Sequence, residues 1–318
     1  MEITSSKSIE PTWWAGVDME PLKEYSGSPM YILYDADILA YRCAAATDGV
    51  YYTVGTEQFK YHKDAKLYVD ASHVLHDPPL YSDIEKHYDP EPVENAISNL
   101  DGLIRKINRD CTEKHKRPMV GLFYLTHDIL FRSEISKTYK CSRVAMRKPV
   151  HLDALKKHLR DNYDAITWEG FEADDLISIS AREKGLDNCI VASVDKDLLQ
   201  IPGWHYNIAS GKSHYQSCHG AKLSFWSQTI IGDKVDDIEG LKGVGPVGAR
   251  DVLKDTDDFS THRDFYNLVL AKYISHNKMA KGETVEEHLI RNIRQLGKAC
   301  RLLWLARDTV NPIWDVPK

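Results

Sequence analysis

Three short apolar runs in this 318-residue chain each lead into an aspartate. The runs cover residues 30–34, 119–125 and 189–194, and the aspartates that follow them are Asp35, Asp128 and Asp195. Runs of this length and composition predict buried strands. Because the carboxyl ends of parallel strands share one edge of a sheet, we expect the three carboxylates to meet there. A capping or loop role would explain any one of them but explains the set poorly.

Helical patterns between these runs define the rest of the expected core. We predict helices over 38–46, 93–107 and 170–184, with Gly185 as the C-cap of the last, and a further strand over 165–168. Alternating strands and helices favour an α/β fold with a mainly parallel central sheet flanked by helices. Residues 50–92 are rich in Tyr, His and Asp, and we expect a β-hairpin and a loop there.

The chain divides into three expected parts. Residues 1–29 form an N-terminal arm whose Trp13 and Trp14 dock on the body, 30–230 form the α/β core, and 231–318 form a helical region with a long helix near 285–307. The length suits one large domain or two smaller ones.

Carboxylates crowd into three short segments. These are Glu172-Ala-Asp174-Asp175, Asp195-Lys-Asp197 and Asp233-Lys-Val-Asp236-Asp237. Like charges packed this closely are unfavourable unless cations neutralise them. Their hard oxygen donors suit Mg²⁺ or Mn²⁺, and two such ions about 4 Å apart are a common device for phosphodiester hydrolysis. The helix dipole explains one or two acids of the first segment, but not the pair that follows the next strand.

The charge distribution favours a polyanionic partner despite a formal net charge of −6. Between residues 132 and 160, nine Lys or Arg face only two acids, a local balance of +7. A basic segment beside an acidic cluster suits nucleic acid held over a metal site. A solvated basic helix face is the alternative interpretation.

Composition points to a cytoplasmic protein that makes no membrane contact. No run approaches the ~20 apolar residues of a membrane span, and the N-terminus lacks an apolar signal core. The six cysteines form no Cys-x-x-Cys pair, so we expect reduced thiols. A zinc site at His214, Cys218 and His219 is an alternative whose spacing matches no common finger.

A glycine-rich turn follows the last acidic segment. Gly243-Val-Gly245-Pro-Val-Gly248 matches a dinucleotide-binding fingerprint only superficially, because no apolar strand precedes it. This argues against a dehydrogenase. We interpret the segment as a helix-hairpin-helix turn whose backbone N–H groups, with Arg250 in the following helix, face a DNA phosphate.

Taken together, these motifs resemble the 5′-nuclease, or flap endonuclease, superfamily, and within it the bacteriophage 5′→3′ exonucleases. The likeness covers roughly residues 30–255 in the family order, and little of it falls on 50–92 or the C-terminal region. It is carried by Asp35, Asp128-Ile-Leu-Phe-Arg132, Tyr139-Lys140-Cys-Ser-Arg143, Glu172-Ala-Asp174-Asp175-Leu, Ser193-Val-Asp195-Lys-Asp197 and Gly232 to Gly245.

The resemblance implies a role for each matching residue. One metal would be held by Asp35, Asp128, Glu172 and Asp174, and a second by Asp175, Asp195 and Asp197, with Asp233 and Asp236 behind them. Lys140 and Arg143 would contact the scissile phosphate from a basic helical arch over about 129–160, with Arg132 at its base. DNA would also be bound by Gly243, Gly245, Gly248, Arg250, Arg147 and Lys148, with a potassium ion at the glycine turn.

The chain departs from the family pattern at three acids. The first strand ends Asp35-Ala36-Asp37 where relatives commonly have Asp-Gly, so Asp37 could compete for or assist metal binding. Asp237 and Glu239 stand where Asn and Pro are usual. Added negative charge there lowers the expected affinity of the glycine turn for a DNA phosphate.

The expected function is a two-metal, structure-specific 5′ nuclease, a 5′→3′ exonuclease or flap endonuclease acting in DNA replication, repair or recombination. We expect a monomer that acts on DNA with 5′ ends or flaps, with RNA primers in hybrids as a further substrate and replication proteins as partners. A PIN-like ribonuclease and a non-catalytic DNA-binding protein of the same fold are the alternatives. Tyr139 and Phe131 are candidates either for stacking on bases or for packing.

Overall fold

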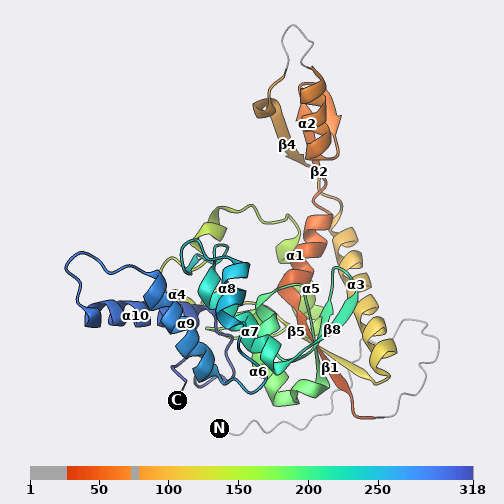
Figure 1. Cartoon of the computed structure of the whole chain (residues 1–318). Coiled ribbons are helices and arrows are strands. Elements are labelled where there is room, and N and C mark those ends of the chain that lie inside the picture. Colours follow the sequence, from red (N-terminus) through yellow and green to blue (C-terminus); the bar gives the residue numbers. More distant parts are fainter. Residues whose placement is uncertain (1–26, 73–78, 318) are drawn as a thin grey trace.

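A five-stranded sheet forms the centre of the molecule in the computed structural model, which describes residues 27–72 and 79–317 (Figure 1). Its order is β5-β1-β6-β7-β8, with β8 antiparallel to β7 and the other neighbours parallel. The strands are β1 (Met30–Asp35), β5 (Met119–Tyr124), β6 (Cys189–Ser193), β7 (Gly203–Asn207) and β8 (Lys212–Gln216). The mainly parallel α/β fold is therefore confirmed. The expected arm, with Trp13 and Trp14, lies outside the described residues.

The predicted strand over 165–168 is wrong. Only Ile166 pairs there, in an isolated parallel bridge with Tyr124. The preceding helix α5 (Leu152–Tyr163) ends with Asp164 at φ 52°, and the chain turns away again at Gly170, where φ is 93°. Because the chain turns at both Asp164 and Gly170, a single residue pairs between them and no continuous strand forms.

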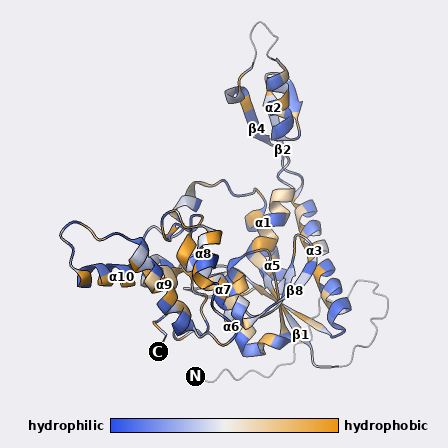
Figure 2. Cartoon of the chain, in the orientation of Figure 1, coloured by the Kyte–Doolittle hydropathy of each residue, from blue (hydrophilic) through white to orange (hydrophobic). Residues whose placement is uncertain are grey.

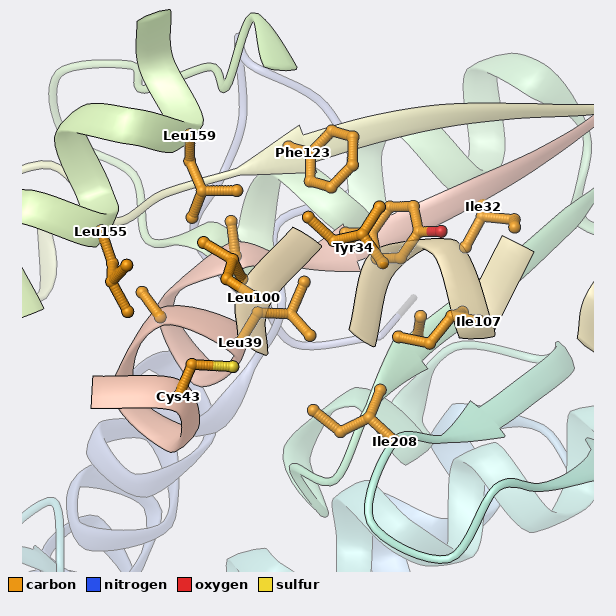
Figure 3. Close-up of a cluster of buried hydrophobic side chains, with 14 of the residues drawn as sticks. Ile32, Tyr34, Leu39, Cys43, Leu100, Ile107, Phe123, Leu155, Leu159 and Ile208 are labelled. Carbon is orange, nitrogen blue, oxygen red and sulfur yellow. The ribbon is translucent and has the colours of Figure 1, made fainter. Parts of the chain in front are cut away.

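One face of the sheet is covered by α5 together with α1 (Ala36–Ala46) and α3 (Val93–His115) (Figure 1). Side chains alternate between the two faces of a strand, so Ile32 and Tyr34 point into this layer. Figure 3 shows Tyr34 beside Phe123, and their rings stack 4.3 Å apart. The helix predicted over 93–107 is confirmed but runs two turns further.

The other face is covered by α6 (Ala173–Lys184) and by residues from the C-terminal end of the chain. Leu33 and Val191 of the sheet pack here against Ile177, Leu305 and Ala306. Gly185 ends α6 at φ 88°, as predicted. The short 3₁₀ helices η5 (Leu186–Asn188) and η6 (Asp197–Gln200) flank β6.

A second core lies among α7 (Cys218–Ile231), α8 (Pro246–Leu253), α9 (His262–His276) and α10 (Val285–Leu303). Trp226, Phe265, Tyr273 and Leu296 are fully buried in it. Figure 2 shows hydrophobic ribbon where α7 and α8 meet and hydrophilic ribbon along the outer side of α3. The predicted C-terminal helix is α10. None of the helices in the described ranges is long and apolar enough to cross a membrane.

The glycine turn follows a β-hairpin instead of directly joining two helices. After α7, the strands β9 (Gly232–Asp233) and β10 (Ile238–Glu239) pair antiparallel before the turn leads into α8. Gly232 has φ 77°, and a Cβ on it would lie 2.4 Å from the backbone nitrogen of Gly240. This close backbone approach requires glycine and folds the hairpin back onto the end of α7.

Residues 50–72 and 79–88 form a small unit that projects from the body (Figure 1). Its sheet has the order β3-β2-β4, from β3 (Glu57–Phe59), β2 (Val50–Val54) and β4 (Ile84–Tyr88). The β2–β3 hairpin matches the prediction, whereas α2 (His62–Ala71), η3 (Tyr81–Asp83) and β4 were not predicted. The basic segment contains α4 (Arg132–Ile135) and η4 (Cys141–Ala145).

Candidate active site

A cavity of about 310 Å³ opens at the carboxyl edge of β1 and β6. Carboxylates dominate its polar lining: Asp35, Asp37, Glu172, Asp174, Asp195, Asp197 and Asp236. They come from the ends of two neighbouring parallel strands and the chain just after β6, the starts of α1 and α6, and the loop between β9 and β10. The parallel sheet thus gathers acids that are far apart in the sequence.

Asp35 occupies the junction between β1 and α1. Its Oδ1 accepts a hydrogen bond from the Ile38 amide at 3.1 Å, which caps α1. Its Oδ2 accepts from the Ser193 hydroxyl at 2.7 Å, which ties β1 to β6. Asp35 is therefore fixed at the inner wall of the cavity.

Asp195 and Asp197 are held by the loop that follows β6. The Asp195 amide donates to Ser193 Oγ at 2.9 Å, and the Asp197 amide donates to Asp195 Oδ1 at 2.9 Å. Gln228 of α7 donates to Asp197. The arrangement orients both carboxylates before any ligand is present.

Burial and mutual repulsion raise the pKa values of these acids. Burial and then the nearby Asp37 and Asp195 raise the pKa of Asp35 to about 7, although Ser193 and Ile38 oppose the shift. Burial and Asp195 raise the pKa of Asp197 to about 6. The pKa of Asp174 is raised well above its usual range by burial and by Asp35, Asp195 and Asp197. The cluster thus holds excess negative potential.

Basic side chains neutralise the other acids around the cavity. Lys140 pairs with Glu172 and lies 3.7 Å from Asp236, and Arg143 pairs with Asp236. Burial alone would raise the pKa of Glu172, but Arg132 and Lys140 outweigh it and lower that pKa. The segment that carries Lys140 is thereby bound to the loop between β9 and β10, and the Lys140 amide donates to the Asp236 carbonyl at 3.1 Å.

Asp175 faces away from the cavity, which corrects its predicted role as a metal ligand. It is 0% exposed, and both of its oxygens are occupied by the Arg132 guanidinium, at 2.5 and 2.8 Å. Successive helical residues point about 100° apart, and of this pair only Asp174 lines the cavity. Arg132, 2% exposed, also donates to the Leu302 and Trp304 carbonyls and stands behind the acids as a positioning residue.

Two other predicted ligands lie outside the cavity lining. Asp128 is exposed in the loop after β5. Asp233 pairs with Lys196 at 2.7 Å and accepts from the Val235 amide, so it shapes the loop after β9.

The expected DNA-binding residues lie on several surfaces. Arg147 pairs with Asp48 and stacks 3.4 Å over the Tyr88 ring, which connects the basic segment to the projecting unit. Lys148 and Arg250 are exposed. Gly243 has φ 78°, and a Cβ on Gly248 would lie 2.9 Å from the Val244 side chain.

Packing explains the two aromatic candidates. Tyr139 is 8% exposed and its hydroxyl donates to Glu172 at 2.7 Å. Phe131 packs edge-on against Phe171. Tyr139 lines the cavity but is buried and hydrogen-bonded, and Phe131 is not part of the lining.

Sequence reasoning did not assign roles to Lys156, Ser193 and Gln228. Lys156 of α5 pairs with Asp37 at 2.5 Å, and Ser193 and Gln228 orient Asp35 and Asp197. Lys156 belongs to the basic segment, so its charge was a usable signal. The roles of Ser193 and Gln228 depend on which elements pack together in the fold, and no local sequence signal reveals them.

The carboxylates without a cationic partner fit a hard divalent ion by donor type. Asp35, Asp174, Asp195 and Asp197 form no ion pair within the described ranges. In the same ranges, no three His, Cys, Asp or Glu side chains already stand together as a metal-binding group. His214 and His219, from the alternative zinc site, pack against His205 and Phe265 respectively.

Comparison with known proteins identifies relatives. Residues 82–223 match the family model described as the N-terminal resolvase-like domain of 5′-3′ exonuclease. A DNA polymerase I of Rhizobium leguminosarum is 30% identical over 209 residues, which is 60% of this chain and only 20% of the polymerase. Flap endonuclease Xni of Vibrio vulnificus strain YJ016 is 28% identical over 189 residues, 54% of this chain and 70% of its own.

Solved structures share the fold at lower identity. A structure described as divalent zinc ions bound to T5 5′-exonuclease superposes with a TM-score of 0.53 at 14% identity, covering 87% of this chain and 89% of that one. A T5 D15 protein co-crystallised with metal ions gives a TM-score of 0.50 at 14% identity, with 86% and 88% covered. In sequence the chain therefore resembles 5′-3′ exonucleases over residues 82–223, and its fold is that of the T5 5′-exonuclease structures.

Proposed function

We propose that this protein is a metal-dependent, structure-specific 5′ nuclease that hydrolyses DNA phosphodiesters. The observation that carries the proposal is the set of four aspartates without cationic partners, Asp35, Asp174, Asp195 and Asp197, in one cavity rimmed by lysine and arginine. Such a site combines a place for divalent ions with groups that attract a phosphate. The flap endonuclease names of its relatives support the same activity.

The four aspartates would hold two Mg²⁺ or Mn²⁺ ions, and Glu172 and Asp236 would join them from the rim. When bound, such ions lower the pKa of a water molecule and stabilise charge on the phosphate. The T5 structures are described with metal ions, which supports metal dependence in this fold.

The basic rim has a separate task. Lys140 and Arg143 currently pair with Glu172 and Asp236, and Lys156 with Asp37. A phosphate that enters the cavity would compete with these carboxylates for the same cations. Lys140 and Arg143 would then bind the scissile phosphate and offset its developing charge.

A second contact with DNA would come from the turn at Gly243–Gly248 and from exposed Arg250 and Lys148. Backbone amides at such a turn bind phosphates without reading base sequence, and a potassium ion at the turn completes this part of the proposal. Substrates would be DNA with 5′ ends or flaps and RNA primers in hybrids. We propose a cytoplasmic monomer that works beside replication proteins.

The test uses a duplex with a 5′ flap, labelled at the 5′ end in one sample and at the 3′ end in another. Mg²⁺ is compared with EDTA, and Asp174→Asn is compared with Asp187→Asn, an exposed acid in η5. We expect metal-dependent products from the 5′ end in the wild type and in Asp187→Asn, and none in Asp174→Asn.

Other outcomes identify the alternatives. Cleavage of RNA in preference to DNA would indicate a PIN-like ribonuclease. Flap binding without cleavage in Mg²⁺ or Mn²⁺ would indicate a non-catalytic DNA-binding protein.

A further inference from the structure

A second cavity, of about 290 Å³, lies next to the acidic one. The two are separated by the segment after α10, and Leu305 lines both. Its walls come mainly from α6, α7, the start of α9 and residues 304–307. None of the acids of the candidate active site lines it.

The second cavity is cationic where the first is acidic. Its charged lining consists of Arg182, Lys222 and Arg307, and no Asp or Glu among the described residues takes part. His262 is the other titratable nitrogen base on its wall. The two cavities therefore have opposite polarity across one short segment of chain.

The two arginines are held in place without acidic partners. Arg307 stacks over the Trp304 ring at 3.9 Å, and its Nη2 lies 3.1 Å from His262 Nε2. Arg182 Nε is buried and has no hydrogen-bond partner. Neither arginine forms an ion pair within the described ranges, whereas Lys222 Nζ donates to the Ser260 carbonyl at 2.5 Å.

Placing two guanidinium groups at one cavity without an anion is unfavourable in free energy, because the two charges are partly buried and repel each other. Burial and then Arg182 lower the pKa of Arg307 to about 9, and burial lowers the pKa of Arg182. The buried Arg182 Nε, which has no partner, adds a desolvation cost. An anion between the arginines would remove both penalties.

We propose that this second cavity binds a phosphate group through Arg182 and Arg307, with Lys222 as a third cation. The planar guanidinium fork matches phosphate oxygens, and three positive charges suit a dianion better than a carboxylate. The volume lies at the small end of ligand sites, which favours a phosphate ion or a mononucleotide over a larger ligand. A backbone phosphate of DNA offers the same chemistry. This inference does not depend on the proposed nuclease activity.

The test measures binding directly, in EDTA, so that neither metal nor cleavage takes part. Inorganic phosphate and deoxyadenosine 5′-monophosphate are titrated calorimetrically into the full chain, with acetate at equal ionic strength as the reference anion. The same titrations use the double variant Arg182→Gln/Arg307→Gln and the control Arg294→Gln, which removes an exposed charge on α10. Binding of a 5′-flap duplex is measured in parallel.

Two results support the proposal and identify the source of the phosphate. Saturable phosphate or nucleotide binding that weakens at least tenfold in the double variant, with unchanged DNA affinity, assigns the cavity to a free anion. Loss of DNA affinity in the double variant but not in Arg294→Gln, with weak binding of free phosphate, assigns it to the DNA backbone.

One result overturns the proposal. If wild type and double variant bind phosphate, nucleotide and flap DNA equally, the cavity does not hold a phosphate. Should the double variant fail to fold, Arg182→Lys replaces it, because this variant keeps the charge and removes the guanidinium fork. Wild-type titrations in which phosphate neither saturates the protein nor competes with DNA would also overturn the proposal.

Discussion

Arg132 and Asp175 form a two-pronged ion pair that is almost completely buried, with N–O distances of 2.5 and 2.8 Å. The same guanidinium reaches Glu172 at 3.1 Å and the Leu302 and Trp304 carbonyls at the C-terminal end of α10. Removing it would leave Asp175 buried without a counter-ion and Glu172 with Lys140 alone. The pair therefore belongs to the architecture of the cavity wall.

Arg132→Met should lower the free energy of unfolding by about 3–5 kcal/mol, the usual loss when one partner of a buried pair is removed. Urea denaturation measures it. The control Arg109→Met breaks an exposed 3.7 Å pair with Asp110 and should cost less than about 1 kcal/mol. A loss below 1 kcal/mol for Arg132→Met would contradict this role.

Asp174 and Asp175 should respond oppositely to removal of charge. Asp174→Asn relieves repulsion from Asp35, Asp195 and Asp197, and should stabilise the metal-free protein at pH 8 by about 1 kcal/mol or more. Asp175→Asn should destabilise it, because Arg132 loses its partner. Thermal unfolding in EDTA measures the melting temperature of both variants. Equal shifts of the melting temperature in one direction would show that the two acids do not differ in this way.

Lys140→Ala should lower the single-turnover cleavage rate about tenfold, equivalent to about 1.4 kcal/mol. Lys140 lies between Glu172 and Asp236 at the cavity, where an incoming phosphate would meet it. Lys137→Ala, an exposed lysine of the same segment, is the matched control. Equal rates for the two variants would exclude Lys140 from phosphate binding.

Acid should destabilise the protein through His205. This side chain is 5% exposed, and burial and then the nearby His214 lower its pKa to about 4, although a bond to the Ile201 carbonyl opposes the shift. The unfolded chain binds this proton near pH 6.5, so stability present above that pH is lost as the pH falls towards 4. The shift corresponds to about 3 kcal/mol.

His205→Gln cannot titrate and retains a donor for Ile201. Its unfolding free energy should fall about 3 kcal/mol less than that of the wild type between pH 7 and 4, measured by urea unfolding. Parallel pH profiles would show that His205 does not carry the acid sensitivity.

DNA affinity should fall steeply with salt, because each phosphate contact releases counter-ions. Arg250→Gln should weaken flap binding equally for different sequences and reduce the salt slope by about 1. Fluorescence anisotropy at several salt concentrations measures this, with Arg294→Gln as control. If Arg250→Gln leaves the salt dependence of DNA affinity unchanged, the duplex does not contact Arg250.

The parts of the fold that could be predicted from the sequence are those with strong local signals. The apolar runs before Asp35 and Asp195 are β1 and β6, and the acids reach one cavity because those strands are parallel neighbours. In contrast, α2 is a polar helix that buries only Ala65 and Val69 in its small unit, so its apolar pattern is weak.

Details of the site depended on distant contacts. Nothing local distinguishes Asp174 from Asp175. The difference comes from Arg132, and from the Ala306 amide that donates to Asp175 at 2.9 Å across 131 positions of sequence. Likewise, α7 supplies Gln228 to Asp197 only because the second core packs against the sheet.

The contacts of residues 302–306 also bear on how the protein is synthesised. A ribosome delivers Arg132 and Asp175 long before the Leu302 and Trp304 carbonyls and the Ala306 amide that complete their bonding. The wall of the acidic cavity is therefore incomplete in the nascent chain until residue 306 has left the exit tunnel. The order of translation thus places the assembly of this wall after the synthesis of residues 302–306, far downstream of the acids that it supports.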